Sequence, residues 1–220
     1  MNAAAHSELN LEEPSILRAT WVKGIPTSHD EMLYIGDVPL VHRTEQGIQE
    51  QMVEQSVSVG DRVLEIGYGW GFASLAIERK SPVLHTIIEA NNVLAQTARN
   101  KMRNAQVICG FWEDVVGSKL DFYDSVIFDA CSSLSFEQGL AVDLAIRHLV
   151  PAWHILMPRL KSGTKIGVIV PTGNLTEAEI VALMPSKVKT FKLTDSINCP
   201  QPTVNGWFSD GCKLLTLIAP

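Results

Sequence analysis

Apolar residues gather in short runs along the chain, separated by segments in which they recur at helical spacing. The runs predict seven strands, at 62–67, 83–89, 105–109, 123–129, 165–170, 188–193 and 213–218. Helical spacing covers 70–80, 91–103 and 137–160, with Pro151 and Pro158 interrupting the last segment. Because strands and helices alternate, the sequence predicts an α/β fold with a doubly wound, Rossmann-like, mostly parallel sheet.

Both ends of the chain depart from this alternation. The last two predicted strands are joined by a loop rich in Pro, Asn and Gly, so we expect a hairpin with the terminal strand inserted antiparallel. Thr176 and Glu179 form a capping-box pattern, which predicts a short helix over 176–183. Pro and Gly interrupt residues 1–45, which we interpret as a cover over the carboxyl edge of the sheet, with 46–220 as the main domain of one compact unit.

A predicted strand runs into a helix through the glycine-rich sequence 65–71. Gly67 and Gly69 allow a tight turn and a close approach to a ligand, at the edge where open α/β sheets bind nucleotides. Glu89 ends the next strand, about 20 residues after the first glycine, where a carboxylate binds ribose hydroxyls. Phe72 replaces the third glycine of a dinucleotide fingerprint, and no P-loop lysine follows. The pattern therefore favours an adenosine cofactor without phosphates over NAD or phosphoryl transfer.

Composition narrows the classes of function. The 220 residues, 46% hydrophobic, suffice for one soluble domain, and a net charge of -6 without a Lys/Arg cluster argues against nucleic-acid binding. No apolar stretch reaches the length of a membrane span and the N-terminus lacks signal-peptide regions, so we expect a cytoplasmic protein without a membrane partner. The four cysteines have no metal-binding spacing, so we expect no metal. A cytoplasmic location also disfavours a disulfide between Cys199 and Cys212.

Four sequence blocks occur in order, at 63–69, 87–91, 110–115 and 128–129. They resemble the successive motifs of class I S-adenosylmethionine-dependent methyltransferases, and specifically the guanidinoacetate N-methyltransferase family. The Trp-Glu-Asp-Val sequence within the third block is the most specific of these matches. The resemblance runs from about 36 to 172, with Pro39, Arg43 and Glu45 upstream of the glycines. It implies the class I methyltransferase fold, with S-adenosyl-L-methionine as cofactor and S-adenosyl-L-homocysteine as product.

The resemblance also assigns residues to the cofactor. It implies that the methionine part is bound by the glycine turn and its neighbours, which are Val41, Gly67, Tyr68, Gly69, Trp70, Gly71, Phe72 and Ala73. It implies a ribose contact for Glu89, Ala90 and Asn91, and an adenine contact for Trp112 and Glu113. Core packing of Trp112 and an exposed position of Glu113 near a helix start are the alternatives. Glu89 is harder to explain otherwise, since a carboxylate ending an apolar strand needs a partner.

The same resemblance makes Asp129 and Glu45 the catalytic pair, because in the family two carboxylates bind a guanidinium. A guanidinium has a pKa above about 12 and is a poor nucleophile, so paired acceptors must orient one nitrogen and favour its loss of a proton. Pro171 and Thr172 occupy the stretch that binds the substrate carboxylate in the family. We expect neither Asp129 nor Glu45 in the hydrophobic core.

Three departures from the family pattern affect the substrate. Thr44 replaces a Trp, Cys131 replaces an aromatic residue, and Pro171 has no N–H to donate. We therefore expect a small-molecule acceptor shaped differently from guanidinoacetate, such as a larger guanidino or amino compound. The alternatives are an O- or amine-methyltransferase of another metabolite, with Asp129 or one of His42, His148 and His154 as base, and a catalytically inactive partner subunit. A homodimer is compatible with the sequence.

Overall fold

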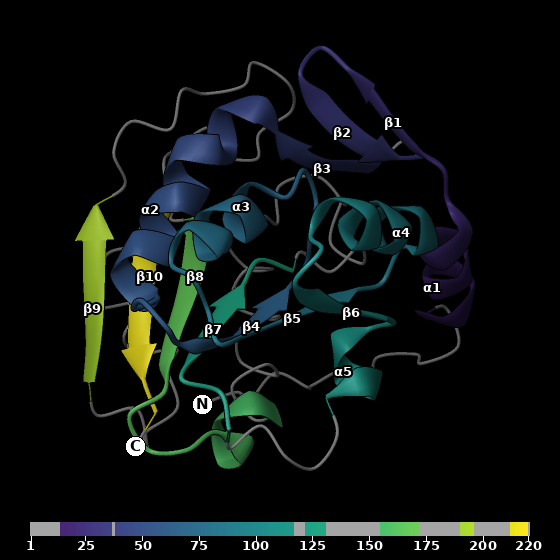
Figure 1. Ribbon diagram of the computed structural model, residues 1–220. Helices are drawn as coiled ribbons and strands as arrows, with labels where there is room; N and C mark the ends of the chain where they lie inside the picture. Colours follow the sequence, from purple (N-terminus) through teal and green to yellow (C-terminus); the bar gives the residue numbers. More distant parts are fainter. Residues whose placement is uncertain are drawn as a thin grey trace, which may run out of the picture.

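A seven-stranded sheet forms the centre of the protein (Figure 1). The computed structural model describes residues 14–36, 38–116, 122–130, 155–171, 190–195 and 212–219. The strands are β4 (Arg62–Ile66), β5 (Leu84–Glu89), β6 (Ala105–Cys109), β7 (Ser125–Phe128), β8 (Lys165–Pro171), β9 (Thr190–Asp195) and β10 (Cys212–Ile218). Their order is β6-β5-β4-β7-β8-β10-β9. Each strand begins and ends within two residues of its prediction.

The sheet is parallel except at one end. Strands β4 to β8 pair in parallel, whereas β10 lies between β8 and β9 and is antiparallel to both. This confirms the predicted α/β fold with a mostly parallel sheet and an antiparallel terminal hairpin. All carboxyl ends of the parallel strands meet at one edge, where ligands of open α/β sheets bind.

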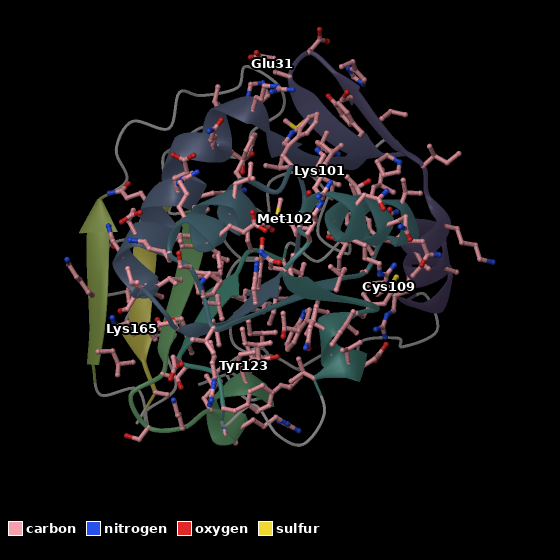
Figure 2. The ribbon with its side chains drawn as sticks, in the orientation of Figure 1. Glu31, Lys101, Met102, Cys109, Tyr123 and Lys165 are labelled. Atoms are coloured by element: carbon pink, nitrogen blue, oxygen red, sulfur yellow. The ribbon has the colours of Figure 1, made fainter. Side chains whose placement is uncertain are left out.

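Helices cover both faces of the sheet because successive strand residues point to opposite sides. Helices α2 (Gln46–Ser56), α3 (Phe72–Arg79) and α4 (Asn92–Lys101) lie over one face, and α5 (Trp112–Val115) lies over the other (Figure 1). Val63 accordingly packs against α2 and α3, while the next residue, Leu64, packs in the opposite cluster with Tyr123. Tyr123 lies on the side of the sheet away from α3 (Figure 2). The 3-10 helix η3 (Met157–Arg159) lies within the predicted helical segment 137–160, whose residues 137–154 lie outside the described part, as does the segment 176–183.

The N-terminal part contains a second sheet that the sequence did not predict. Helix α1 (Pro14–Lys23) precedes β1 (Pro26–His29), β2 (Met32–Ile35) and β3 (Val38–His42), which form an antiparallel sheet in the order β1-β2-β3. The first strand is polar, and the turn uses Asp30 and Glu31 at φ 48° and 62° where hairpins usually place Asn-Gly. The usual sequence signals of a hairpin are therefore absent.

This second sheet packs on the glycine-rich region. Its apolar residues Leu33, Ile35 and Val41 share one buried cluster with Tyr68 of the turn and Leu94 of α4. The 3-10 helix η1 (Arg43–Glu45) then connects β3 to α2. No helix in the described ranges is both long and apolar enough to cross a membrane, and within the same ranges no group of His, Cys, Asp and Glu could hold a metal ion.

Candidate active site

The glycine turn between β4 and α3 requires glycine for steric reasons. Gly67, Gly69 and Gly71 have φ of 93°, 52° and 80°, in the left-handed region that other residues rarely adopt. The Gly71 amide donates to the Tyr68 carbonyl at 2.7 Å and closes the turn. A Cβ atom on Gly67 would lie 2.4 Å from the carbonyl oxygen of Asp129. The turn is therefore held directly against the end of β7.

Glu89 organises this turn from the neighbouring strand. Its two carboxylate oxygens accept the backbone amides of Tyr68 at 2.9 Å and Asn91 at 2.7 Å. The side chain is only 6% exposed, and burial raises its pKa, although the hydrogen bonds from backbone amides act in the opposite direction. The sequence indicated that the Glu89 carboxylate needs a hydrogen-bonding partner, and that partner is the backbone at Tyr68 and Asn91, on both sides of the predicted ribose position. Ala90 is half-buried next to it.

Asn91 directs its side chain into the protein. Its Oδ1 atom accepts the amides of Val93 and Leu94 and caps α4, and its Nδ2 atom donates to the carbonyls of Trp21 and Gly24, both at 2.8 Å. Two acceptor and two donor positions exhaust the capacity of an amide side chain. A ribose contact from Asn91 would therefore come from its backbone, while its side chain fixes the N-terminal segment beside the site.

The remaining turn residues combine packing with access to the edge. Trp70 is half-buried, and its indole N–H donates to the Val41 carbonyl at 3.0 Å. Phe72 is buried, and Ala73 packs in the core between α2 and α3. The side chain of Ala73 thus serves the core, and a contact with the cofactor would use its backbone.

The segment predicted to border adenine lies beside α1. Trp112 is half-buried and packs edge-on against Phe128, with ring centroids 5.3 Å apart, so the packing expected as its alternative role is present. Glu113 is exposed in the first turn of α5, which was also its alternative. Arg18 pairs with Asp114 at 2.7 Å. These contacts leave the cofactor roles of Trp112 and Glu113 as predictions.

Asp129 follows β7 at the carboxyl edge, and its amide donates to the Ile66 carbonyl at 3.0 Å. The residue as a whole is half-buried, and among the described residues no hydrogen bond to its carboxyl group is found. Burial, together with the nearby carboxylate of Glu65, raises the pKa of Asp129 to about 7. A cationic partner would therefore be needed to keep this group fully ionised at neutral pH.

Glu65 belongs to a buried cluster that the sequence did not predict. It is fully buried in β4, and both of its carboxylate oxygens lie within 2.8 Å of the Ser74 hydroxyl of α3. His85 of β5 places its Nε2 atom 2.8 Å from the same carboxylate. The cluster could have been predicted from a histidine and a glutamate on adjacent predicted strands, because neighbouring parallel strands bring such residues together on one face of the sheet.

Glu45 ends η1 and precedes α2, and it is buried, although it belongs to none of the hydrophobic clusters of the described residues. Its side chain is only 7% exposed, and its carboxylate accepts the His42 amide at 2.7 Å in a capping box. The His42 ring accepts the Thr44 amide at Nδ1 and lies 3.2 Å from the Asp30 carbonyl at Nε2. Both ring nitrogens of His42 therefore have hydrogen-bond partners, which disfavours His42 as a base.

The two proposed catalytic acids lie on segments that contact the same turn. Val41, four residues before Glu45, would be 3.1 Å from a Cβ on Gly69, and the Asp129 backbone meets Gly67. Pro171 ends β8, the strand next to β7. Other residues considered from the sequence lie outside the described part: Cys131, His148, His154, Thr172 and Cys199.

Comparisons with known proteins agree with this geometry. The profile of the family described as guanidinoacetate N-methyltransferase matches residues 18–141. The methyltransferase SMU.776, solved with S-adenosylhomocysteine, is similar with a TM-score of 0.58 and 13% identity, over 89% of this chain and 56% of that one. TYW2 of M. jannaschii, solved with S-adenosylmethionine, has a TM-score of 0.57 and 12% identity, over 89% and 85%. The N-methyltransferase NodS of Bradyrhizobium japonicum has a TM-score of 0.57 and 14% identity, over 80% and 97%.

At these identities the structural neighbours establish the fold, whereas the family profile covers more than half of the chain. The chain spans little more than half the length of SMU.776, at 56%.

Proposed function

Because the chain belongs to the guanidinoacetate N-methyltransferase family, we propose that it is an S-adenosylmethionine-dependent methyltransferase that methylates a nitrogen of a guanidino or related cationic amino compound. The acceptor is a small molecule held between Asp129 and Glu45. Support comes from the two carboxylates themselves, which lie on segments that contact one glycine turn, at Gly67 and at Gly69.

The residues present fit S-adenosylmethionine. Three glycines with positive φ open the turn, and the buried Glu89 carboxylate holds the amides around the ribose position. In this proposal the turn from Gly67 to Gly71 binds the methionine part, and Trp112 and Glu113 border the adenine. The bound cofactor supplies an electrophilic methyl group on a positively charged sulfur.

The observation that carries the proposal is the state of Asp129. The carboxyl group sits beside the cofactor turn without a described donor, and burial with the Glu65 charge raises its pKa to about 7. An opposite charge within about 4–6 Å favours the ionised form of an acid. Binding of a guanidinium would therefore lower the pKa of Asp129 and form a charge-assisted pair, whereas a neutral or anionic acceptor would leave the acid partly protonated or repel it.

Asp129 then has two tasks in catalysis. Its carboxylate accepts N–H groups of the guanidinium and so orients one nitrogen toward the methyl group. As the new C–N bond forms and the methyl–sulfur bond breaks, that nitrogen becomes more acidic, and Asp129 accepts its proton. The rigid end of β7 suits this role, because the Asp129 amide is bonded to β4.

Glu45 has the complementary task of holding the acceptor. Its carboxylate is fixed by the His42 amide at the start of α2, so it presents a positioned negative charge. Thr44 leaves more space than the tryptophan found there in the family, and Pro171 removes one amide donor for a substrate carboxylate. Both changes support an acceptor that differs from guanidinoacetate, either larger or without its carboxylate.

The test is a methyl-transfer screen with S-adenosylmethionine labelled with tritium in its methyl group. Arginine, agmatine, guanidinoacetate and related amines are compared with phenols, carboxylates and nucleic acid. We expect label on at least one guanidino or amino compound, and we expect the Asp129→Asn variant to lose that labelling while it still binds S-adenosylhomocysteine. Labelling confined to phenols, carboxylates or nucleic acid would refute the proposed acceptor class.

A further inference from the structure

We propose that Trp70 is a positioning residue that couples the cofactor turn to the segment carrying Glu45. This inference rests on the proposed function, because it gives Glu45 a substrate to hold. Trp70 follows Gly69 within the turn, yet its side chain contacts the N-terminal sheet. The coupling would align the acceptor-binding carboxylate when the cofactor occupies the turn.

Three contacts join the turn to the end of β3. The Trp70 indole N–H donates to the Val41 carbonyl at 3.0 Å. The guanidinium carbon of Arg43 lies 5.0 Å from the centre of the Trp70 ring, within the range of a cation–π interaction. The Val41 side chain lies so close to Gly69 that a Cβ there would be 3.1 Å from its Cγ1 atom. We call these contacts the Trp70 latch.

The position of β3 brings it against the turn. In the order β1-β2-β3 this strand is an edge, with one side paired to β2 and the other facing the turn. The Trp70 N–H adds a hydrogen bond to the Val41 carbonyl, and the Arg43 guanidinium lies over the Trp70 ring. Both contacts join the turn to the end of β3.

The latch lies close to Glu45 along the chain. Val41 is in β3, Arg43 begins η1, and Glu45 ends η1 while its carboxylate accepts the His42 amide. A displacement of the turn would therefore reach Glu45 through only four residues, two of which contact Trp70 directly. Since the turn is the element that binds the cofactor in our proposal, a bound ligand that suppresses local opening of the turn should also suppress opening of residues 38–45.

The experiment measures amide hydrogen exchange of peptides covering 38–45, with and without saturating S-adenosylhomocysteine. In the parent protein we expect the ligand to slow exchange in this segment by about 10-fold, because bound ligand suppresses local opening. In Trp70→Leu this protection should be lost at ligand saturation. Trp70→Phe, which keeps the ring under Arg43 but removes the N–H, should retain only part of it, and Arg43→Gln should also retain only part.

A control separates coupling from general loss of stability. Ile166→Val removes one methylene from a fully buried position in the opposite hydrophobic cluster, so it should lower the Tm but keep the full ligand-induced protection of 38–45. In addition, Trp70→Phe should raise the KM for the acceptor more than it lowers kcat, since Glu45 is misaligned while Asp129 is untouched.

The outcomes distinguish this inference from the proposed function. If all three latch variants kept parent-like protection of 38–45 with ligand bound, the coupling role of Trp70 would be refuted whatever the acceptor is. If the exchange results followed our expectation but no guanidino or amino compound were methylated, the latch would stand and the proposed acceptor would fall. Should Trp70→Leu fail to bind S-adenosylhomocysteine, Trp70→Phe and Arg43→Gln decide the question.

Discussion

At the scale of single residues, the proposed methyl transfer depends on whether the Asp129 carboxyl group carries a proton. Asp129 is an acid whose pKa is raised to about 7 by burial and by the Glu65 charge. Glu65 itself is held between the Ser74 hydroxyl and the His85 ring. The buried cluster beneath the turn therefore influences the group proposed to bind the acceptor and receive its proton.

Asp129→Asn tests this residue directly. The substitution keeps the shape but removes the proton acceptor, so kcat should fall by about two to four orders of magnitude. In the parent, kcat/KM should decrease as the pH drops below about 7, because the protonated acid no longer binds a cation. Steady-state rates of the parent and of Asp129→Asn, measured from about pH 5.5 to about pH 9, give both the loss of kcat and the pH dependence of kcat/KM. A variant that turned over its acceptor at the parent rate would exclude Asp129 as the base.

Glu45 allows a matched pair of substitutions. Glu45→Gln keeps an acceptor for the His42 amide and should raise the KM for a cationic acceptor more than it lowers kcat. Glu45→Ala also removes the capping box and should cost about 1 kcal/mol of stability in addition. Kinetics and thermal unfolding of both variants separate the two roles. Equal KM values for the parent and Glu45→Gln would remove Glu45 from the acceptor site.

At the scale of elements, the unit of β4, glycine turn and α3 forms the frame of the site. Ser74 joins α3 to β4 through Glu65, and Glu89 joins the turn to β5. Because Glu65 and Glu89 are buried, water does not compete for their hydrogen bonds, and this favours a fixed turn. These hydrogen bonds tie the turn to β5 and its following helix α3 to β4.

Gly67→Ala should disrupt this frame, with Gly60→Ala as its control. Both glycines have positive φ, at 93° and 80°, so both variants incur about 1–2 kcal/mol of backbone strain. Only Gly67 would also place a Cβ 2.4 Å from a backbone oxygen, whereas nothing lies within 4 Å of a Cβ on Gly60. We expect Gly67→Ala to lose S-adenosylhomocysteine binding in calorimetry and Gly60→Ala to retain it. Tight binding by Gly67→Ala would show that the turn tolerates displacement.

At the scale of the whole molecule, the N-terminal sheet and the main sheet share one buried cluster. Trp21, Leu33 and Val41 pack with Tyr68 and Leu94, and burial raises the pKa of Tyr68 to about 12, which keeps its hydroxyl neutral. These contacts support our interpretation of residues 1–45 as a cover over the site, which stays a prediction.

The raised pKa of Asp129 also makes the stability of the whole molecule depend on pH. Near pH 3 the acid is mostly protonated in both the folded and unfolded states. As the pH rises toward 7, the unfolded state ionises first, so the parent loses stability that Asp129→Asn keeps. After allowance for partial solvent screening, the variant should be more stable by about 1–2 kcal/mol at pH 8 and nearly equal to the parent at about pH 3. Thermal unfolding at the two pH values measures this difference, and a variant less stable than the parent at pH 8 would contradict the assigned pKa.

The sequence by itself determined the elements of the main sheet. The alternation of apolar and polar positions is a local property, so seven strands, their class of sheet and the final hairpin could be predicted. The glycine turn and Glu89 were also predictable, because their spacing along the chain sets their position at the sheet edge. The family was recognised from four short blocks for the same reason.

Only the tertiary structure decided which groups meet across long separations. The polar β1 gave no periodic signal, so the N-terminal sheet and the bond from Trp70 to Val41 were not predicted. The Glu65–His85 pair joins two strands whose side chains face each other only once the parallel register is set. The raised pKa of Asp129 depends on burial and on the distance to Glu65, which are properties of the folded chain. Local patterns specify elements, whereas the charge and partners of a buried side chain are specified by how those elements pack.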